Sequence, residues 1–258
     1  MGKYDFAGKV VLITGSSSGI GAECARQFAR CGAQVVITGY EAADVVSMVA
    51  EIEQITGTKP YHKTGNLTES GFAEALIDGT VKHYGRLDVL VNNAGSIRAN
   101  DALSSPDFMA TFEWIIELNL KSTVRMMHLA IDHLAQTKGV IVNTSSISAV
   151  TPNQGVSYCS SKAAINMATQ CAAKEFGPRG VRVNAVNPGP IKTNIGRYIN
   201  KPQLMFGSDD LCFETKLTVQ KRNGDPADVA NLVLFLASSE ASYITGAYHL
   251  IDGGFMCH

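Results

Sequence analysis

Short runs of aliphatic and β-branched residues alternate with segments of helical periodicity along the whole chain. The runs expected to form strands are Val10–Thr14, Gln34–Thr38, Leu87–Val91, Val140–Thr144, Val181–Val186 and Ala247–Ile251. They are mostly apolar, as strands buried on both faces of a parallel sheet should be. Amphipathic helices are expected between them, with apolar stripes at Ile20, Cys24 and Phe28, at Val45, Val49 and Ile52, at Phe72 and Leu76, and at Phe108, Phe112 and Ile115. This alternation predicts an α/β fold, a doubly wound Rossmann-type parallel sheet of about seven strands with helices on both faces.

The composition fits one globular domain that spans residues 1–258. Of these residues 45% are hydrophobic and 17% charged, so the chain can bury a large core, and disordered, collagen-like and disulfide-scaffold classes are excluded. The net charge of −1 and the absence of a long run of one sign give no basis for binding nucleic acid or a membrane surface.

Cysteine usage and the amino-terminal segment predict a cytoplasmic protein without a metal. The six cysteines have no CxxC spacing and no His/Cys cluster of the kind that zinc needs, so we expect reduced thiols. We find no apolar signal-peptide core and no run of about 18 apolar residues that would span a bilayer.

One stretch of mixed character, residues 194–223, separates the Val181–Val186 run from the last expected helix. An insertion of this length in a compact domain is usually functional or mobile. Its apolar residues would suit a lid over an apolar ligand, and the alternative is a surface excursion that packs on its own domain. These apolar residues are Tyr198, Ile199, Leu204, Met205, Phe206, Leu211, Phe213 and Leu217.

A glycine-rich turn, Thr-Gly-Ser-Ser-Ser-Gly-Ile-Gly at residues 14–21, joins the first strand to the first helix. Such a turn lets backbone N–H groups and the positive helix end face a pyrophosphate, although Gly and Ser also simply make turns. Asn-Asn-Ala-Gly at residues 92–95 ends the Leu87–Val91 strand, which in this topology neighbours the first strand at the switch point. Both loops should therefore line one crevice, unless the two Asn residues only form a turn.

The most specific signal is Tyr158 and Lys162, four residues apart and so on one face of a helix. A nearby ammonium favours the ionised form of a phenol, whose ordinary pKa of about 10 makes it a poor base at neutral pH. Taken alone, such a pair is commonly a surface contact. Its context includes Ser145 and Ser146 at the end of the preceding strand, and Asn119 on a long helix that Ser105 and Pro106 are expected to start.

Together these motifs resemble the short-chain dehydrogenase/reductase family, in its branch of 3-oxoacyl-carrier-protein reductases and hydroxysteroid dehydrogenases, from about Gly8 to Gly254. The motifs of the family appear in this chain in the family's order. They are the turn at residues 14–21, the Asn-Asn-Ala-Gly segment, Asn119, the Ser, Tyr-x-x-x-Lys, Asn-Pro-Gly at residues 187–189 with Thr193, and Asp-Gly-Gly at residues 252–254. The resemblance implies an NAD(P)-dependent oxidoreductase that interconverts a carbonyl and a secondary alcohol.

Each role below is what the resemblance implies. Tyr158 would be the general acid in reduction and the base in oxidation, while a Ser hydroxyl binds the substrate oxygen. Lys162 would bind the nicotinamide ribose and lower the pKa of Tyr158, and Asn119 would hold a water that links Lys162 to solvent. The remaining cofactor contacts would be Gly15, Ser17, Ser18, Ile20, Gly21, Tyr40, Asn66, Leu67, Asn93, Gly95, Pro188, Gly189, Ile191 and Thr193.

The chain departs from the family pattern at the catalytic Ser. The loop before Tyr158 is one residue short, so counting back from Tyr158 selects Ser145, whereas anchoring on the strand end selects Ser146. We prefer Ser146, because a deletion is easier in a loop than a register slip in a buried strand.

A second departure concerns the nucleotide. Gly39 and Tyr40 stand where relatives carry an acid for the ribose 2′-hydroxyl or an Arg for a 2′-phosphate. The hydroxyls of Ser16, Ser17 and Thr38 could still bind a phosphate, which favours NADP(H) slightly over NAD(H).

The apolar lid favours a lipophilic or acyl substrate over a sugar. Two alternatives differ in class: a dinucleotide-binding regulatory protein without chemistry, and an isomerase or dehydratase on the same fold. The resemblance also implies a homotetramer, for which Val124, Met127 and Met167 offer apolar side chains that equally suit the core.

Overall fold

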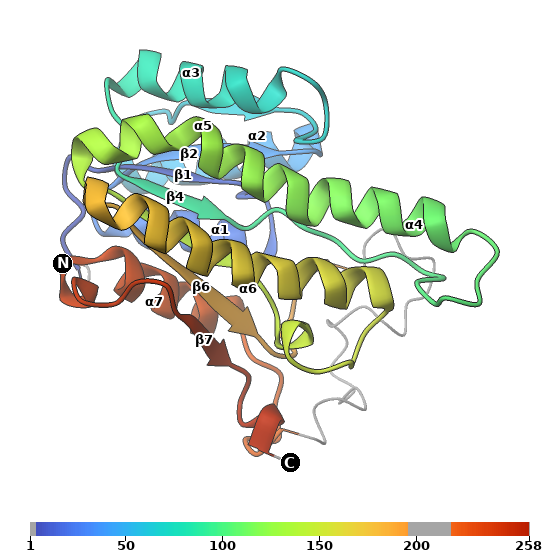
Figure 1. Ribbon diagram of the computed structural model, residues 1–258. Helices are drawn as coiled ribbons and strands as arrows, with labels where there is room; N and C mark the ends of the chain where they lie inside the picture. The colour runs from blue at the N-terminus through green and yellow to red at the C-terminus, as the bar shows by residue number, and fades with distance from the viewer. Residues whose placement is uncertain (1–3, 196–217, 258) are drawn as a thin grey trace.

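The computed structural model describes residues 4–195 and 218–257, and its centre is one sheet of seven parallel strands (Figure 1). The strand order is β3-β2-β1-β4-β5-β6-β7, with a crossover between β1 and β4. The strands are β1 (Val10–Ile13), β2 (Gln34–Gly39), β3 (His62–Thr64), β4 (Val89–Asn92), β5 (Val140–Thr144), β6 (Arg182–Pro188) and β7 (Tyr248–Ile251). This arrangement confirms the predicted doubly wound, Rossmann-type sheet.

The strands differ from the prediction mainly at one edge. β1, β4 and β5 are buried along their whole length, which agrees with their apolar sequences. The sequence did not predict β3, because its three residues, His-Lys-Thr, have neither apolar character nor alternation. It pairs with β2 alone, at the edge of the sheet, where a short polar strand is stable because only one side needs a partner.

Helices cover both faces of the sheet (Figure 1). The residues buried on one face come from α1, α2 and α7, and those on the other from α3, α5 and α6. The helices are α1 (Gly19–Arg30), α2 (Ala42–Thr56), α3 (Phe72–Tyr84), α4 (Phe108–Ile115), α5 (Ser122–Thr137), α6 (Val156–Phe176) and α7 (Pro226–Ala237).

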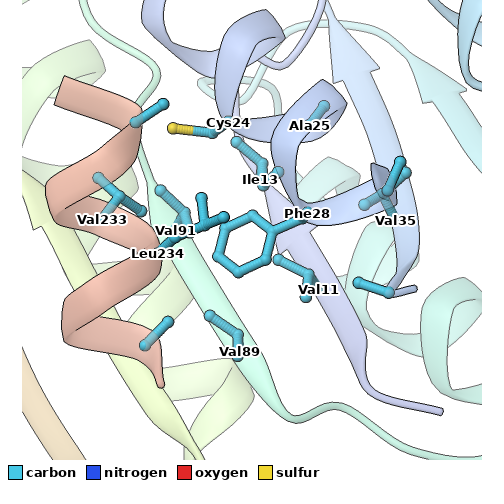
Figure 2. Packing of buried hydrophobic residues seen from close by; sticks show 14 of the residues in the cluster. Val11, Ile13, Cys24, Ala25, Phe28, Val35, Val89, Val91, Val233 and Leu234 are labelled. Atoms are coloured by element: carbon cyan, nitrogen blue, oxygen red, sulfur yellow. The ribbon is translucent and has the colours of Figure 1, made fainter. Parts of the chain in front are cut away.

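Phe28 on α1 is at the centre of the first of these layers. Its ring is fully buried between Val11 on β1 and Leu234 on α7, with Cys24 one helical turn away (Figure 2). This contact seats α1 on the sheet and so positions the turn that precedes α1.

The helix that carries Asn119 differs from the prediction. It begins at Phe108 and not at Pro106, because Ser105 and Pro106 lie in a turn in which Ser105 N donates to the Ala102 carbonyl. Between α4 and α5 the chain forms a π-helical turn, Ile116–Lys121, and Asn119 lies within it, fully buried. Widened turns of this kind occur frequently at functional sites.

Among residues 4–195 and 218–257 there is no helix that is long and apolar enough to cross a membrane.

Candidate active site

A cavity of about 930 Å³ opens at the carboxyl ends of the strands. Loops after β1, β2, β4, β5 and β6 all contribute to its wall, as expected where parallel strands end at one edge of a sheet. No group of three or more potential metal ligands occurs in the part of the chain that the structure describes.

The glycine-rich turn forms one end of the cavity. Gly15 and Gly19 have φ values of +66° and +55°, which favour glycine, and both line the cavity. Ser18, at the N-cap of α1, makes no side-chain capping bond, and the first turn of α1 has no acidic residue. The first amides of α1 therefore remain available to an anion, and the turn fits a dinucleotide pyrophosphate.

The position of Gly21 does not agree with the expectation that this residue contacts the cofactor. It is buried and does not line the cavity. A Cβ at this position would overlap the Gly15 carbonyl and the Asn93 side-chain amide. Gly21 thus allows the close approach of α1 to the turn, which is a packing role.

Hydrogen bonds tie the loops after β1 and β4 together. Thr14 Oγ1 accepts from the backbone N–H of Asn93 at 2.9 Å and of Ala94 at 3.0 Å. Asn93 Nδ2 in turn donates to the carbonyl oxygens of Thr14 and Gly15. The two loops of the switch point are therefore held as one unit, as the sequence predicts for a shared crevice.

Tyr158 and Lys162 lie on the first turns of α6, on the cavity wall, and both are buried. Lys162 Nζ lies 5.5 Å from the centre of the Tyr158 ring and donates a 2.9 Å hydrogen bond to the Thr144 carbonyl at the end of β5. The Thr144 carbonyl therefore holds the Lys162 ammonium beside the phenol.

The two candidate serines point in different directions. Ser146 is hydrogen-bonded to the phenol of Tyr158, and its Oγ is 3.1 Å from Ser148 Oγ. Ser145 Oγ donates instead to the carbonyl of Lys162 at 2.9 Å. Only Ser146 therefore presents its hydroxyl beside the phenol.

Burial governs the protonation of the pair. It raises the pKa of Tyr158 to about 12, an effect that the hydrogen bond between Tyr158 and Ser146 opposes. It also lowers the pKa of Lys162 to about 8, so the ammonium persists at neutral pH. At neutral pH the site thus holds a neutral phenol, ready to donate a proton, next to a cation.

Asn119 is behind the cavity wall. Its Oδ1 accepts from Ser96 N at 2.9 Å, and its Nδ2 donates to Ser96 O at 3.0 Å. A Cβ at Gly95 would lie 3.3 Å from Asn119 Oδ1 and 3.5 Å from Lys162 Nζ. Glycine at position 95 therefore keeps a narrow space open between the two side chains, and the proposed role of Asn119 needs such a space.

One expectation is corrected at the end of the cavity next to β2, where the adenosine would bind: that the hydroxyls of Ser16 and Thr38 bind a phosphate. Ser16 is buried, with its Oγ between the Val36 and Thr38 carbonyls, and Thr38 Oγ1 donates to the Lys63 carbonyl. Neither hydroxyl is presented to a phosphate. Ser17 lines the cavity and is close to Gly39, since a Cβ at Gly39 would overlap Ser17 Oγ.

The other expected cofactor residues also line the cavity. Tyr40, Asn66 and Leu67 lie at the adenosine end with the side chains of Glu41 and Asp44, and Gly95 is next to Lys162. The last group lies at the end of β6 and in the loop after it, and consists of Pro188, Gly189, Ile191 and Thr193. Their contacts with a nucleotide stay predictions.

Some residues of the wall were not expected from the sequence. The Arg98 guanidinium stacks 4.0 Å from the Trp114 ring centre, and Ser148 Oγ donates to Asn153 Oδ1 at 2.7 Å. All four line the cavity. Ser148 could have been found from its position two residues after Ser146, whereas nothing in the sequence pairs Arg98 with Trp114.

The fold and the site define a dinucleotide-dependent oxidoreductase. A family model described as enoyl-(acyl carrier protein) reductase matches residues 15–256. The chain belongs to the short-chain dehydrogenase/reductase family, and it is an NAD(P)-dependent enzyme acting on CH–OH groups. This class favours the oxidoreductase over the non-catalytic and the isomerase or dehydratase alternatives.

Relatives of known activity and solved structure extend over almost the whole chain. The 3-oxoacyl-(acyl-carrier-protein) reductase FabG of Thermotoga maritima is 37% identical, with 96% of this chain and 98% of that protein covered. Glucose 1-dehydrogenase 2 of Bacillus subtilis is 32% identical, with coverages of 97% and 95%. A short-chain type dehydrogenase/reductase from Mycobacterium marinum superposes with a TM-score of 0.89 at 30% identity, covering 98% of each chain.

Proposed function

We propose that this enzyme reduces a carbonyl, and oxidises the matching secondary alcohol, with Tyr158 as the proton donor and acceptor. The observation that carries the proposal is the Tyr158 phenol, hydrogen-bonded to Ser146 and 5.5 Å from Lys162 Nζ on the wall of the strand-end cavity. The bound nicotinamide supplies or takes the hydride. Side chains of this protein carry out every other step.

In reduction, the Ser146 hydroxyl donates to the substrate oxygen and holds it next to the phenol. Tyr158 then transfers its proton to that oxygen as negative charge develops on it. The Lys162 ammonium stabilises the resulting phenolate, and the space beside Gly95 lets a water near Asn119 return a proton. Oxidation follows the same path in reverse, with the phenolate as base.

A panel of carbonyl substrates with NADPH and with NADH tests the proposal, followed by absorbance at about 340 nm. Tyr158→Phe should abolish turnover while dinucleotide binding persists, because the phenyl ring keeps the packing and lacks only the hydroxyl group that gives and takes the proton. Tyr243→Phe, at a fully exposed tyrosine, is the matched control and should keep full activity. An active Tyr158→Phe enzyme would refute the assignment.

We propose a lipophilic or acyl substrate. Ile97, Ala99 and Ile195 pack around Tyr158, and all of them line the cavity, which supports an apolar substrate body at this point. The proposed lid at about 194–223 lies mostly in residues 196–217, outside the described part of the chain. The relatives do not decide the matter, because one acts on an oxoacyl thioester and another on glucose by name. Comparing kcat/KM for acyl, steroid and sugar substrates would do so.

The slight preference for NADP(H) also remains a proposal. Ser17 supports it, since its hydroxyl lines the cavity next to Gly39, where an acidic side chain would have no room. The carboxylates of Glu41 and Asp44 at the same end oppose a phosphate. We expect kcat/KM to be higher with NADPH than with NADH, by less than about tenfold.

We further propose that residues 1–258 form one domain, located in the cytoplasm, that assembles as a homotetramer. Val124 on α5 and Met167 on α6 are 43% and 60% exposed, which supports contact between copies, whereas Met127 belongs to the core. Sedimentation showing a stable monomer would contradict the tetramer.

A further inference from the structure

The helix that carries Tyr158 begins without a cap of its own. Gly155, at the N-cap of α6, has no side chain that could accept from the first amides. These amides are satisfied by a residue more than fifty positions earlier, since Val156 N donates to the Asp101 carbonyl at 3.2 Å. Asp101 thus takes the place of the missing cap.

The carboxylate of Asp101 makes the closer contacts. Oδ1 accepts from Ser157 N at 2.9 Å and from Ser157 Oγ at 2.5 Å, and Oδ2 accepts from Tyr158 N at 3.0 Å. Carboxylates are favoured at helix N-termini, where amides and the helix dipole both attract negative charge. Both oxygens are therefore used to hold the turn that ends at Tyr158.

Gly155 gives independent evidence of this close fit. A Cβ at Gly155 would overlap the carboxylate and Cβ of Asp101. Gly155 itself has an ordinary extended backbone, φ −64° and ψ 159°, which any residue can adopt. Glycine is needed here for the approach of Asp101 and not for the backbone conformation.

Asp101 belongs to the loop that follows β4, and this loop also forms part of the cavity wall through residues 93–100. Asp101 does not line the cavity. Any influence of the Asp101 side chain on the reaction is therefore indirect, through the first turn of α6 that it holds to this loop.

We propose that Asp101 is a positioning residue that fixes the Tyr158 phenol relative to the β4 loop and to Ser146. The inference rests on the proposed role of Tyr158 as proton donor and acceptor. A displacement of about 1 Å at a reacting group can reduce turnover about a hundredfold, so loosening this turn lowers kcat more than cofactor binding.

Three variants test the inference, together with wild type and Tyr158→Phe. Asp101→Ala removes all side-chain acceptors, and Asp101→Asn keeps one oxygen for Ser157 while placing an NH₂ group opposite Tyr158 N. Ser157→Ala is the matched control, because it removes the hydroxyl bond and leaves both backbone bonds. We expect kcat to fall about tenfold to a hundredfold in Asp101→Ala, less in Asp101→Asn, and no more than about twofold in Ser157→Ala. The Kd for the dinucleotide should stay within about twofold of wild type throughout.

Hydrogen exchange of a peptide that covers residues 155–160 supplies a readout that does not depend on activity. The amides of Ser157 and Tyr158 should both exchange faster in Asp101→Ala than in Ser157→Ala, and the amide of Tyr158 should also do so in Asp101→Asn. Unchanged exchange, or a kcat of Asp101→Ala equal to that of Ser157→Ala while Tyr158→Phe is inactive, would overturn this inference alone. Turnover by Tyr158→Phe would overturn the proposed function first, and the positioning role with it.

Discussion

Ser145 donates its hydroxyl hydrogen bond to the carbonyl oxygen of Lys162, one residue away from the serine that meets the Tyr158 phenol. The neighbouring serines are thus divided between two tasks. Ser145 connects the end of β5 to α6, and Ser146 presents its hydroxyl to the cavity.

The matched pair Ser146→Ala and Ser145→Ala should separate these tasks. Removing Ser146 takes away the donor to the substrate oxygen, and kcat should fall by about 10²–10³-fold. Removing Ser145 breaks a buried helix contact and should lower the free energy of unfolding by about 1 kcal/mol, with kcat nearly unchanged. Steady-state kinetics and urea unfolding measure the two effects. Equal losses of kcat would show that the division is wrong.

The pKa of Tyr158 predicts opposite pH dependences for the two directions. Because burial raises that pKa to about 12, the phenol is protonated at neutral pH. The reductive kcat should stay constant between about pH 5 and pH 7, since the phenol and the Lys162 ammonium, whose pKa is about 8, are both protonated there, whereas the oxidative kcat should rise because it needs the phenolate. Initial rates in both directions over this interval decide the point. A reductive kcat that falls with an apparent pKa near 7 would contradict the prediction.

Gly21→Ala should destabilise the protein because the new methyl group meets backbone of the Gly15 turn, which cannot yield as a flexible side chain would. We expect a loss of about 1–3 kcal/mol in the free energy of unfolding and weaker dinucleotide binding. Gly177→Ala is the control: the φ of Gly177 is −52°, nothing lies within 4 Å of the added Cβ, and the stability of this variant should not decrease. Similar melting temperatures for the two variants would be evidence against the packing role of Gly21.

Tyr40→Arg should shift the cofactor preference toward NADPH. Tyr40 is 63% exposed at the adenosine end of the cavity, so a guanidinium there can approach a 2′-phosphate. The ratio of kcat/KM for NADPH to that for NADH should increase at least about tenfold, which corresponds to about 1.4 kcal/mol. Tyr243→Arg, the same change at an exposed position away from the cavity, should leave the ratio as it is.

The fold could be predicted from sequence where burial imposes a pattern. β1 and β5 are apolar because both faces are covered, and their limits were predicted within a residue. β3 was missed because an edge strand of three polar residues needs no such pattern. The helix start at Ser105 and Pro106 was wrong because local capping preference does not exclude a turn that precedes the helix.

In the candidate site, too, local patterns could be predicted from the sequence, whereas contacts between distant residues could not. The spacing of Tyr158 and Lys162 could be recognised in the sequence, since both lie on one helix. The contact of Asp101 with α6 could not, because it joins residues far apart in the chain and depends on the course of a loop. The sequence also allowed the hydroxyls of Ser16 and Thr38 to bind a phosphate, because it does not show that the folded chain uses them in internal hydrogen bonds.

The π-helical turn at Ile116–Lys121 makes this stretch unusually sensitive to chain length. α-Helical residues follow one another at about 100°, so deleting one residue here would rotate α5 by about that angle relative to α4. The buried side of α5, which includes Met126, Ala130 and Leu134, would then turn off the sheet, or Asn119 would turn away from Ser96. The length of the π-helical turn therefore keeps α5 packed on the sheet and Asn119 bonded to Ser96 at the same time. The segment should accept substitutions more readily than insertions or deletions.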